Sequence, residues 1–323
     1  MAGHSSLNKL TDGFGRQIDY LRVSVTDRCN LNCIYCRPRS RIEHLSHFDI
    51  LRYEEILEIV RVAKAMGIRK FRITGGEPLI RKGLPDFLRR LAGLGVDFSL
   101  TTNGVLLPVL AKDLADAGLK RINVSLDSLK AERFNQITRG GDLKEVLNGI
   151  EKAKRLFLKV KINTVVMAGI NDDEINDFAD MALKQGLQIR FIEFMNLFSG
   201  EDRFVSLQEV KKNLIEQKGL LPLEDEGIGP ATNFYSSKSK GMIGFITPRS
   251  QPFCKNCNRL RLTADGRLKP CLASNIKIDI KNPLRNKADA QKLKEIFREA
   301  CRQKPKGHNL NFERINLMSS IGG

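Results

Sequence analysis

Strand-like and helix-like stretches alternate six times between residue 20 and about residue 195. Amphipathic stretches of helical period, such as YEEILEIVRVAKAMG and LKEVLNGIEKAKRLF, separate the strands. Six β/α units in succession predict an α/β fold with a parallel sheet, which is either wound as a barrel or doubly wound. The predicted strands cover residues 21–26, 70–74, 98–102, 121–126, 160–166 and 188–194.

One face of these strands is polar. Strands of a parallel sheet are usually buried on both faces and read as continuous apolar runs. The apolar residues here must pack on the outer helices, so the polar ones must line the inside, unless single positions face solvent on edge strands. A closed eight-stranded barrel fills its interior with side chains, so the pattern predicts an open, incomplete (β/α)6 barrel with a wet interior that receives an anion. The polar set includes Arg22, Lys70, Arg72, Ser99, Thr101, Asn123, Ser125, Asp127, Lys161 and Asn163.

The chain is strongly basic, with 54 Lys and Arg against 37 Asp and Glu and a net charge of +17. Such a balance suggests an anionic partner, which could be nucleic acid, a membrane or a phosphorylated small molecule, or it is only a solvated surface. The N-terminus lacks the apolar core of a signal peptide, and no apolar run reaches the roughly 18 residues of a membrane span. We therefore expect a cytoplasmic protein without a membrane partner.

Six of the seven cysteines fall into two triplets. Cys29, Cys33 and Cys36 follow the first predicted strand as C-x3-C-x2-C, and the second triplet is C-x2-C-x13-C. Because the cytosol keeps thiols reduced, clustered cysteines indicate metal or iron–sulfur ligands. Three thiolates leave one iron of a four-iron cluster open to substrate, as in catalytic zinc sites with an open position. A structural zinc site with His44 or His47 is the alternative for the first triplet.

The second triplet also lacks a fourth cysteine nearby. It comprises Cys254, Cys257 and Cys271 in FCKNCNRLRLTADGRLKPCL. Cys301 could complete it, but a lone cysteine in a predicted helix is more often a small core residue.

The segment TGGEP (residues 74–78) comes one β/α unit after the first triplet. Two glycines allow the backbone to approach a ligand closely and leave its amide and carbonyl groups available. Together with CNLNCIYC, this segment resembles the radical S-adenosylmethionine (SAM) superfamily. The resemblance implies a partial six-unit barrel and a cluster whose open iron binds SAM. One electron then cleaves SAM to a 5′-deoxyadenosyl radical.

A narrower resemblance covers nearly the whole chain. LRVSVTDRCNLNCIYC, TGGEPLIR, LTTNG, INVSLDSL, VKINTVV, RFIEFM, FCKNCNRLRLTADGRLKPCL and the terminal IGG are similar to the GTP 3′,8-cyclase family of molybdenum-cofactor biosynthesis. This implies a lyase that converts GTP to (8S)-3′,8-cyclo-7,8-dihydroguanosine 5′-triphosphate. It also implies two [4Fe–4S] clusters, the second of which binds the guanine base. One departure is Arg37, where the family commonly has Met.

The resemblance also assigns roles to residues. No catalytic residue is implied beyond the SAM-cleaving cluster, and the paired Gly322 and Gly323 are expected to reach the active site. The expected SAM contacts are Tyr35, Gly76, Ser125 and Met195. The expected GTP contacts are Arg22, Lys70, Arg72, Thr101, Lys161, Arg190, Arg259 and Arg261.

We expect two domains. Residues 1–200 would form the partial barrel with the SAM-cleaving cluster. Residues 201–323 would form a C-terminal extension with the second cluster and the Gly-Gly tail, covering the barrel mouth. Strands at 241–247 and 259–263 and a helix at about 289–303 are predicted there.

The family resemblance implies several partners. They are GTP, a reduced electron donor of the flavodoxin or ferredoxin type, a downstream pyranopterin synthase and a second copy in a homodimer, but no nucleic acid. The first competing interpretation is a radical SAM enzyme with an auxiliary cluster that modifies a peptide. The second is a basic RNA-binding zinc protein.

Overall fold

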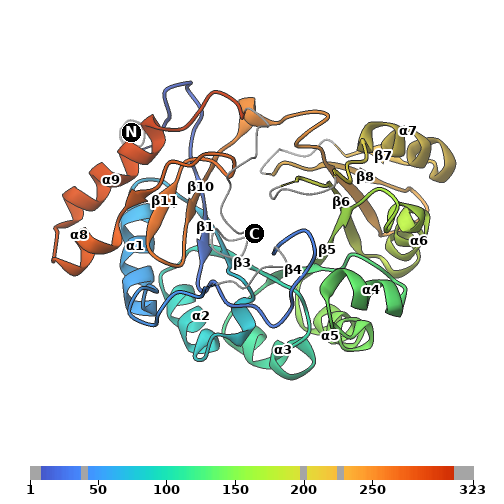
Figure 1. The fold of residues 1–323 in the computed structure, drawn as a ribbon, viewed down its shortest axis with the longest axis horizontal. Coiled ribbons are helices and arrows are strands. Elements are labelled where there is room, and N and C mark those ends of the chain that lie inside the picture. Colours follow the sequence, from blue (N-terminus) through green and yellow to red (C-terminus); the bar gives the residue numbers. More distant parts are fainter. Residues whose placement is uncertain (1–8, 38–42, 197–201, 224–228, 309–323) are drawn as a thin grey trace, which may run out of the picture.

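The computed structural model describes residues 9–37, 43–196, 202–223 and 229–308. Within these residues, one sheet of 12 strands forms the centre of the molecule, and helices cover its outside (Figure 1). The strands are β1 (Tyr20–Ser24), β2 (Lys70–Thr74), β3 (Asp97–Thr102), β4 (Arg121–Ser125), β5 (Lys159–Val166), β6 (Gln188–Glu193), β7 (Leu221–Pro222), β8 (Thr232–Tyr235), β9 (Met242–Ile246), β10 (Arg259–Leu262), β11 (Arg267–Lys269) and β12 (Ile278–Asp279). The helices are α1 (Tyr53–Ala65), α2 (Leu84–Gly93), α3 (Leu107–Asp116), α4 (Ala131–Thr138), α5 (Leu143–Leu156), α6 (Ile175–Gln185), α7 (Leu207–Lys218), α8 (Lys281–Arg285) and α9 (Ala290–Arg302).

The sheet curves into a barrel that stays open. Its strand order is β12-β11-β10-β1-β2-β3-β4-β5-β6-β9-β8-β7, so β12 and β7 lie at opposite ends of the order. The strands from β10 through β1–β6 to β9 pair in parallel, whereas β11, β12, β8 and β7 continue the sheet antiparallel at its two edges. The prediction of an incomplete (β/α)6 barrel is confirmed, and its six strands lie where the sequence pattern placed them.

Apolar and polar residues that alternate along the strands lie on opposite faces of the sheet, as predicted. In β2, Phe71 and Ile73 are buried in the apolar layer beneath the helices, while Arg72 between them is half-buried. Helix α1 meets this layer with one face, which includes Ile56 and Val60. Its first turn is held because the Glu55 carboxylate accepts a hydrogen bond from the Arg52 backbone N–H at 2.7 Å. The apolar side of the sheet is therefore the core, and the polar side is left for the interior.

The C-terminal region joins the sheet at both of its edges. Strand β9 pairs with β6, and β10 pairs with β1, so segments far apart in sequence lie side by side (Figure 1). The strands predicted at 241–247 and 259–263 and the helix predicted at 289–303 are present as β9, β10 and α9. The pattern of residues did not predict this double pairing.

Two other expectations can be compared with the fold. Cys301 is 1% exposed and belongs to the apolar core, as expected for a lone cysteine in a helix. In the part of the chain that the structure describes, no helix has the length and apolar character needed to cross a bilayer.

Candidate active site

The inside of the partial barrel holds a cavity of about 710 Å³. Small-molecule sites commonly have about 300–1,000 Å³, so the cavity has the size of a small-molecule site. Every site residue predicted from the sequence within the described part of the chain lines it: Cys29, Cys33, Cys36, Cys254, Cys257, Cys271, Tyr35, Gly76, Ser125, Met195, Arg22, Lys70, Arg72, Thr101, Lys161, Arg190, Arg259 and Arg261.

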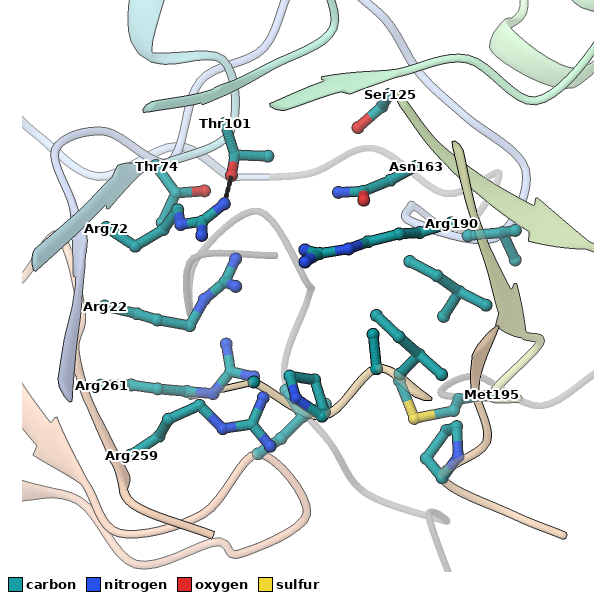
Figure 2. Close-up of a pocket in the computed structure, with 18 of the residues that line it drawn as sticks. Arg22, Arg72, Thr74, Thr101, Ser125, Asn163, Arg190, Met195, Arg259 and Arg261 are labelled. Atoms are coloured by element: carbon teal, nitrogen blue, oxygen red, sulfur yellow. Dashed lines mark hydrogen bonds between the residues drawn. The ribbon is translucent and has the colours of Figure 1, made fainter. Parts of the chain in front are cut away.

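Arginines form a row across three neighbouring strands on one wall. Arg22 of β1 lies directly opposite Arg261 of β10 and Arg72 of β2. Figure 2 shows the side chains of these residues and of Arg259 extending from one side into the cavity. The Arg72 guanidinium donates to the Tyr20 hydroxyl at 2.9 Å and to the Thr101 hydroxyl at 3.4 Å. Arg72 is thus held in place by two hydroxyl groups.

Crowding of like charges marks this row. Burial and the nearby Arg261, Arg72 and Arg259 hold the pKa of Arg22 well below its ordinary value. Burial, with Arg259 next, lowers the pKa of Arg261 to about 10. Burial alone would raise the pKa of Tyr20, but the adjacent Arg72, Arg22 and Arg259 lower it. Charges of one sign in a low dielectric repel strongly, so a multivalent anion would stabilise the row.

The opposite wall supplies a smaller set of polar groups. Arg190 of β6 lies beside Asn163 of β5, which lies beside Ser125 of β4. In Figure 2 the Arg190 side chain extends across the cavity toward Arg22 and Arg72. The alternation along β6 was too weak to predict this orientation for Arg190.

The described lining carries ten Lys and Arg residues and four Asp and Glu residues. All four carboxylates are already engaged: Asp97 pairs with Arg121, and Glu77, Asp127 and Glu193 accept hydrogen bonds from neighbouring backbone or side-chain donors. The cavity therefore selects an anion.

The first cysteine triplet occupies the loop after β1. The backbone N–H groups of Cys36 and Arg37 both donate to the Cys33 carbonyl at 3.0 Å, and the Leu31 N–H points at the Cys29 sulfur at 3.4 Å. Burial raises the pKa of Cys33 well above its ordinary value, and Cys36 and Asp127 raise it further. Iron ligation requires thiolates, so a bound cluster would have to keep these thiols ionised.

The glycines of TGGEP pack against this cysteine loop. The Gly76 N–H donates to the Thr26 carbonyl at 2.6 Å, and a Cβ at Gly76 would lie 2.1 Å from the Arg28 carbonyl oxygen. Gly76 is thus needed for close contact between two backbone segments, in addition to lining the cavity. The two glycines of the motif predicted close approach to a ligand, and the contact with the cysteine loop is a second reason for Gly76.

Glu77 is the residue directly after Gly76 and is 1% exposed. Its carboxylate accepts hydrogen bonds from Leu79 N–H, the Thr102 hydroxyl and Asn103 N–H. Burial raises the pKa of Glu77 to about 7 even though these hydrogen bonds lower it. Asn103 also points its amide at the Cys29 sulfur at 3.8 Å, so one loop connects the carboxylate with the triplet.

Tyr35 is tied to the end of β4. Its hydroxyl donates to the Asp127 carboxylate at 2.7 Å, and Asp127 also accepts from the Val165 N–H at 2.8 Å. Burial raises the pKa of Asp127 to about 6. The sequence placed Asp127 on the polar face through alternation, but no sequence signal paired it with Tyr35.

The second triplet lies where β10 begins and β11 ends. Cys254 opens a short 3-10 helix (Cys254–Asn256), and Cys257 ends it. Burial would raise the pKa of Cys257, but Arg259 and Lys304 lower it to about 7. The Lys304 ammonium donates to the Cys257 sulfur at 3.4 Å. Sequence reasoning missed Lys304, because nothing local marks it.

Each cysteine triplet supplies three thiols as possible ligands. Among the described residues, no three His, Cys, Asp or Glu side chains converge closely enough to hold one metal ion. Thiolates of an iron–sulfur cluster bind separate irons and need not converge on one point. His44 and His47 are both exposed, and His44 faces Asp27 at 3.3 Å. The arrangement does not favour the zinc alternative.

The sequence also singled out Arg37 and the C-terminal glycines, and the structure describes only the first of these. Arg37 is buried, and its guanidinium donates to the Asp27 carbonyl at 2.8 Å. It thus closes the loop that carries the first triplet. The Gly322–Gly323 tail lies outside the described residues and stays a prediction.

Family models and curated relatives cover nearly all of the chain. Residues 23–182 match the radical SAM superfamily, and residues 187–310 match Molybdenum Cofactor Synthesis C. The chain is 49% identical over 322 residues to the GTP 3′,8-cyclase of Thermodesulfovibrio yellowstonii and 46% identical over 328 residues to that of Heliobacterium modesticaldum. Each alignment covers 97% of this chain and 100% of the relative.

Solved structures share the fold at much lower identity. SuiB of Streptococcus suis bound to S-adenosylmethionine is 16% identical with a TM-score of 0.58, over 88% of this chain and 68% of SuiB. The anSMEcpe protein with bound AdoMet is 16% identical with a TM-score of 0.57, over 89% of this chain and 80% of that protein. Both likenesses concern the radical SAM fold alone.

Proposed function

The chain belongs to the GTP 3′,8-cyclase family of radical SAM enzymes, and from this premise we propose how its cavity carries out the first step of molybdenum-cofactor biosynthesis. SAM lies at the first triplet, the triphosphate of GTP lies along the cationic walls, and the guanine lies at the second triplet. The observation that carries the proposal is that both triplets and the arginine row line one cavity.

At the first triplet, Cys29, Cys33 and Cys36 would hold a four-iron cluster with one open iron. Tyr35, Gly76, Ser125 and Met195, which all line the cavity, would contact SAM. The bound cluster, given one electron by the donor, would let SAM supply a 5′-deoxyadenosyl radical that takes up the C3′ hydrogen of GTP. C3′ would then bond to C8 of the guanine, and a second electron and a proton would complete the dihydro product. The Tyr35–Asp127 hydrogen bond fixes this wall and keeps the SAM side of the cavity in one shape.

The cationic walls would bind the triphosphate. Arg22, Arg72 and Arg261 form the row on one side, and Lys161 and Arg190 lie on the other strands of the cavity. Guanidinium forks match phosphate oxygens, and lysine adds a point charge. Burial first and neighbouring arginines second lower the pKa values of Arg22 and Arg261, and a ligand with several negative charges would relieve the repulsion between these arginines. Lys70 and Thr101 are further predicted contacts of GTP and also line the cavity.

At the other end of the cavity, Cys254, Cys257 and Cys271 would hold a second cluster that binds the guanine. Arg259 lies beside Cys257, with its guanidinium 3.8 Å from that sulfur and above the Phe253 ring. Arg259 and Arg261 would flank the nucleotide between cluster and triphosphate. Holding GTP at both ends fixes the distance between its ribose and the SAM side, which is the positioning that the reaction needs.

Family membership supports the remaining parts of the proposal. These are a flavodoxin- or ferredoxin-type electron donor, a pyranopterin synthase that takes the product, a homodimer, a cytoplasmic location and no nucleic-acid partner. We also propose that residues 1–200 carry the SAM-cleaving cluster and residues 201–323 the second cluster. The two parts share one sheet, because β9 pairs with β6 and β10 pairs with β1.

The competing interpretation, a radical SAM enzyme acting on a peptide, predicts no excess of cations in the cavity. Ten basic residues against four acidic ones in the described lining favour a polyanionic nucleotide instead.

The test is anaerobic reconstitution with iron and sulfide, followed by dithionite, SAM and GTP, with products identified by mass spectrometry. We expect 5′-deoxyadenosine and the 3′,8-cyclised nucleotide in a GTP-dependent reaction. Release of 5′-deoxyadenosine that does not depend on GTP, with no cyclised product, would contradict the proposal. ATP in place of GTP is the matched control, because it carries the same triphosphate with a different base.

A further inference from the structure

Lys304 has an unusual environment for a lysine. It is 3% exposed and lies just beyond α9. Its ammonium donates to the Arg259 carbonyl at 2.8 Å, to the Pro270 carbonyl at 2.9 Å and to the Cys257 sulfur at 3.4 Å. An ammonium has three N–H donors, so these three acceptors use all of them.

The acceptors belong to the segments that carry two of the three cysteines. Arg259 comes two residues after Cys257, and Pro270 immediately precedes Cys271. Lys304 therefore ties the first strand of the C-terminal hairpin, β10, to the end of the second, β11. Lys304 itself belongs to the segment that follows α9, and not to the segments that carry these cysteines.

A second buried cation, Arg16, contacts the backbone at the remaining cysteine, Cys254. The Arg16 guanidinium donates to the Cys254 carbonyl at 2.8 Å and to the Pro305 and Lys306 carbonyls at 2.6 and 3.1 Å. Asp12 fixes that guanidinium at 2.5 Å. Arg16 thus connects Cys254 with the segment that carries Lys304, and the two cations together contact the backbone or sulfur around all three cysteines.

The charge of Lys304 needs an anion. A buried ammonium is costly unless it is paired, and among the described residues no carboxylate lies within ion-pair distance of Lys304. The negative group that its hydrogen bonds reach is the sulfur of Cys257 when that sulfur is ionised. A cluster ligated by Cys257 would keep it so.

We propose that Lys304 is a positioning residue of the second cluster. Its ammonium donates a hydrogen bond to the Cys257 thiolate, and this hydrogen bond orients the cluster and raises the reduction potential of the cluster. This inference rests on the proposed second cluster. Hydrogen bonds to cluster sulfurs are among the factors that set the potentials of iron–sulfur proteins, and groups beyond the direct ligands orient those ligands. A reduced cluster carries one more negative charge, so a donor with a positive charge stabilises the reduced form more than the oxidised one.

The test compares Lys304→Met, Lys304→Arg and Lys306→Met in the full, anaerobically reconstituted chain. Lys306 is the matched control, because it lies in the same segment with an exposed side chain and Met leaves its carbonyl in place for Arg16. Iron content, EPR spectra and redox titration are measured for each variant. The signal of the second cluster is identified as the one that persists when the first triplet is replaced by serine.

In Lys304→Met we expect the reduced-to-oxidised ratio of the second cluster at a fixed potential to fall about tenfold, a shift of about 59 mV for one electron. Its EPR line shape should change as well, while the first cluster stays as in the wild type. Lys304→Arg should restore part of the shift, and Lys306→Met should match the wild type. Loss of the second cluster alone in Lys304→Met, with rescue by Lys304→Arg, supports the same positioning role.

Two results overturn the inference. The first is an unchanged potential and line shape in Lys304→Met. The second is equal loss of both clusters, which would make Lys304 a residue of the general fold. A wild-type protein that binds iron for only the first cluster would instead refute the proposed second cluster, and the inference with it.

Discussion

Arg22 and Arg261 lie directly opposite each other on the parallel strands β1 and β10, although they come from opposite ends of the chain. Burial lowers the pKa of both residues, Arg261 lowers the pKa of Arg22 further, and Arg259 lowers both. A cationic wall that crosses the edge between the barrel and the C-terminal region can bind one ligand only if both parts are in place. Binding of GTP is therefore expected to depend on the pairing of β10 with β1 as much as on single arginines.

Replacing Arg72 or Lys161 by Ala should weaken GTP binding and leave cluster content unchanged. Loss of a hydrogen bond to a charged group costs about 1.5–3 kcal/mol, which is roughly tenfold or more in affinity. Calorimetric titration of the reconstituted protein with GTP measures the effect. Lys112→Ala is the control, because Lys112 is exposed on α3 and pairs only with Asp116 among the described residues. Unchanged affinity in both cavity variants would place the triphosphate elsewhere.

Cys33→Ser should abolish reductive cleavage of SAM. One of the three thiolates that hold the first cluster is lost, whereas Cys254, Cys257 and Cys271 are intact and should still bind iron. Iron content together with the yield of 5′-deoxyadenosine distinguishes the two sites. Cys301→Ser is the matched control, since Cys301 is buried in the core and does not line the cavity. Wild-type yields of 5′-deoxyadenosine from Cys33→Ser would refute the assignment of the first triplet.

Stability should fall as the pH rises, because burial raises the pKa of Glu77 from 4.5 to about 7. The folded state then binds more protons than the unfolded state between these two pH values. The stabilisation is fully present below about pH 4.5 and is lost as the pH rises through 7. At 1.36 kcal/mol for each pKa unit, the total loss is about 3 kcal/mol.

Glu77→Gln tests this expectation. Urea unfolding of the iron-free chain under a thiol reductant should show a much flatter slope between pH 6 and 7 in the variant. This window avoids most of the contribution of Asp127, whose pKa is raised only to about 6. An amide cannot accept all the hydrogen bonds that Glu77 accepts, so the variant should be less stable than the wild type at low pH, and the difference should shrink as the pH rises through 7. Glu58→Gln is the control, because the Glu58 side chain is 47% exposed on α1, and an unchanged slope in Glu77→Gln would contradict the raised pKa.

Removal of Gly322 and Gly323 should leave cluster content and GTP binding near normal but greatly reduce the amount of cyclised product. The expectation comes from the family resemblance, in which paired glycines allow the backbone to approach a ligand without a side chain. Product formation over time by mass spectrometry is the measurement. A truncated chain that turns over at the wild-type rate would show that the tail has no role in catalysis.

Local patterns were enough to predict much of this protein. The period of two along the strands placed Arg22, Arg72 and Lys161 inside the barrel, because successive side chains of a strand point to opposite faces. The spacing of Cys29, Cys33 and Cys36 after a predicted strand indicated a cluster site, because loops at that end of parallel strands form active sites. Both inferences use residues that are close in sequence, and the family resemblance added the roles.

The tertiary structure alone decided how distant segments meet. Register between β10 and β1 brings Arg261 beside Arg22, and no local pattern encodes which strand pairs with which edge. The same holds for Lys304, whose ammonium reaches Cys257 only because α9 packs beside α1 and ends at the second triplet. Gly76 tolerates no side chain because Arg28 approaches it from another loop. Such contacts depend on packing and non-local hydrogen bonds, which become fixed only when the whole sheet has formed.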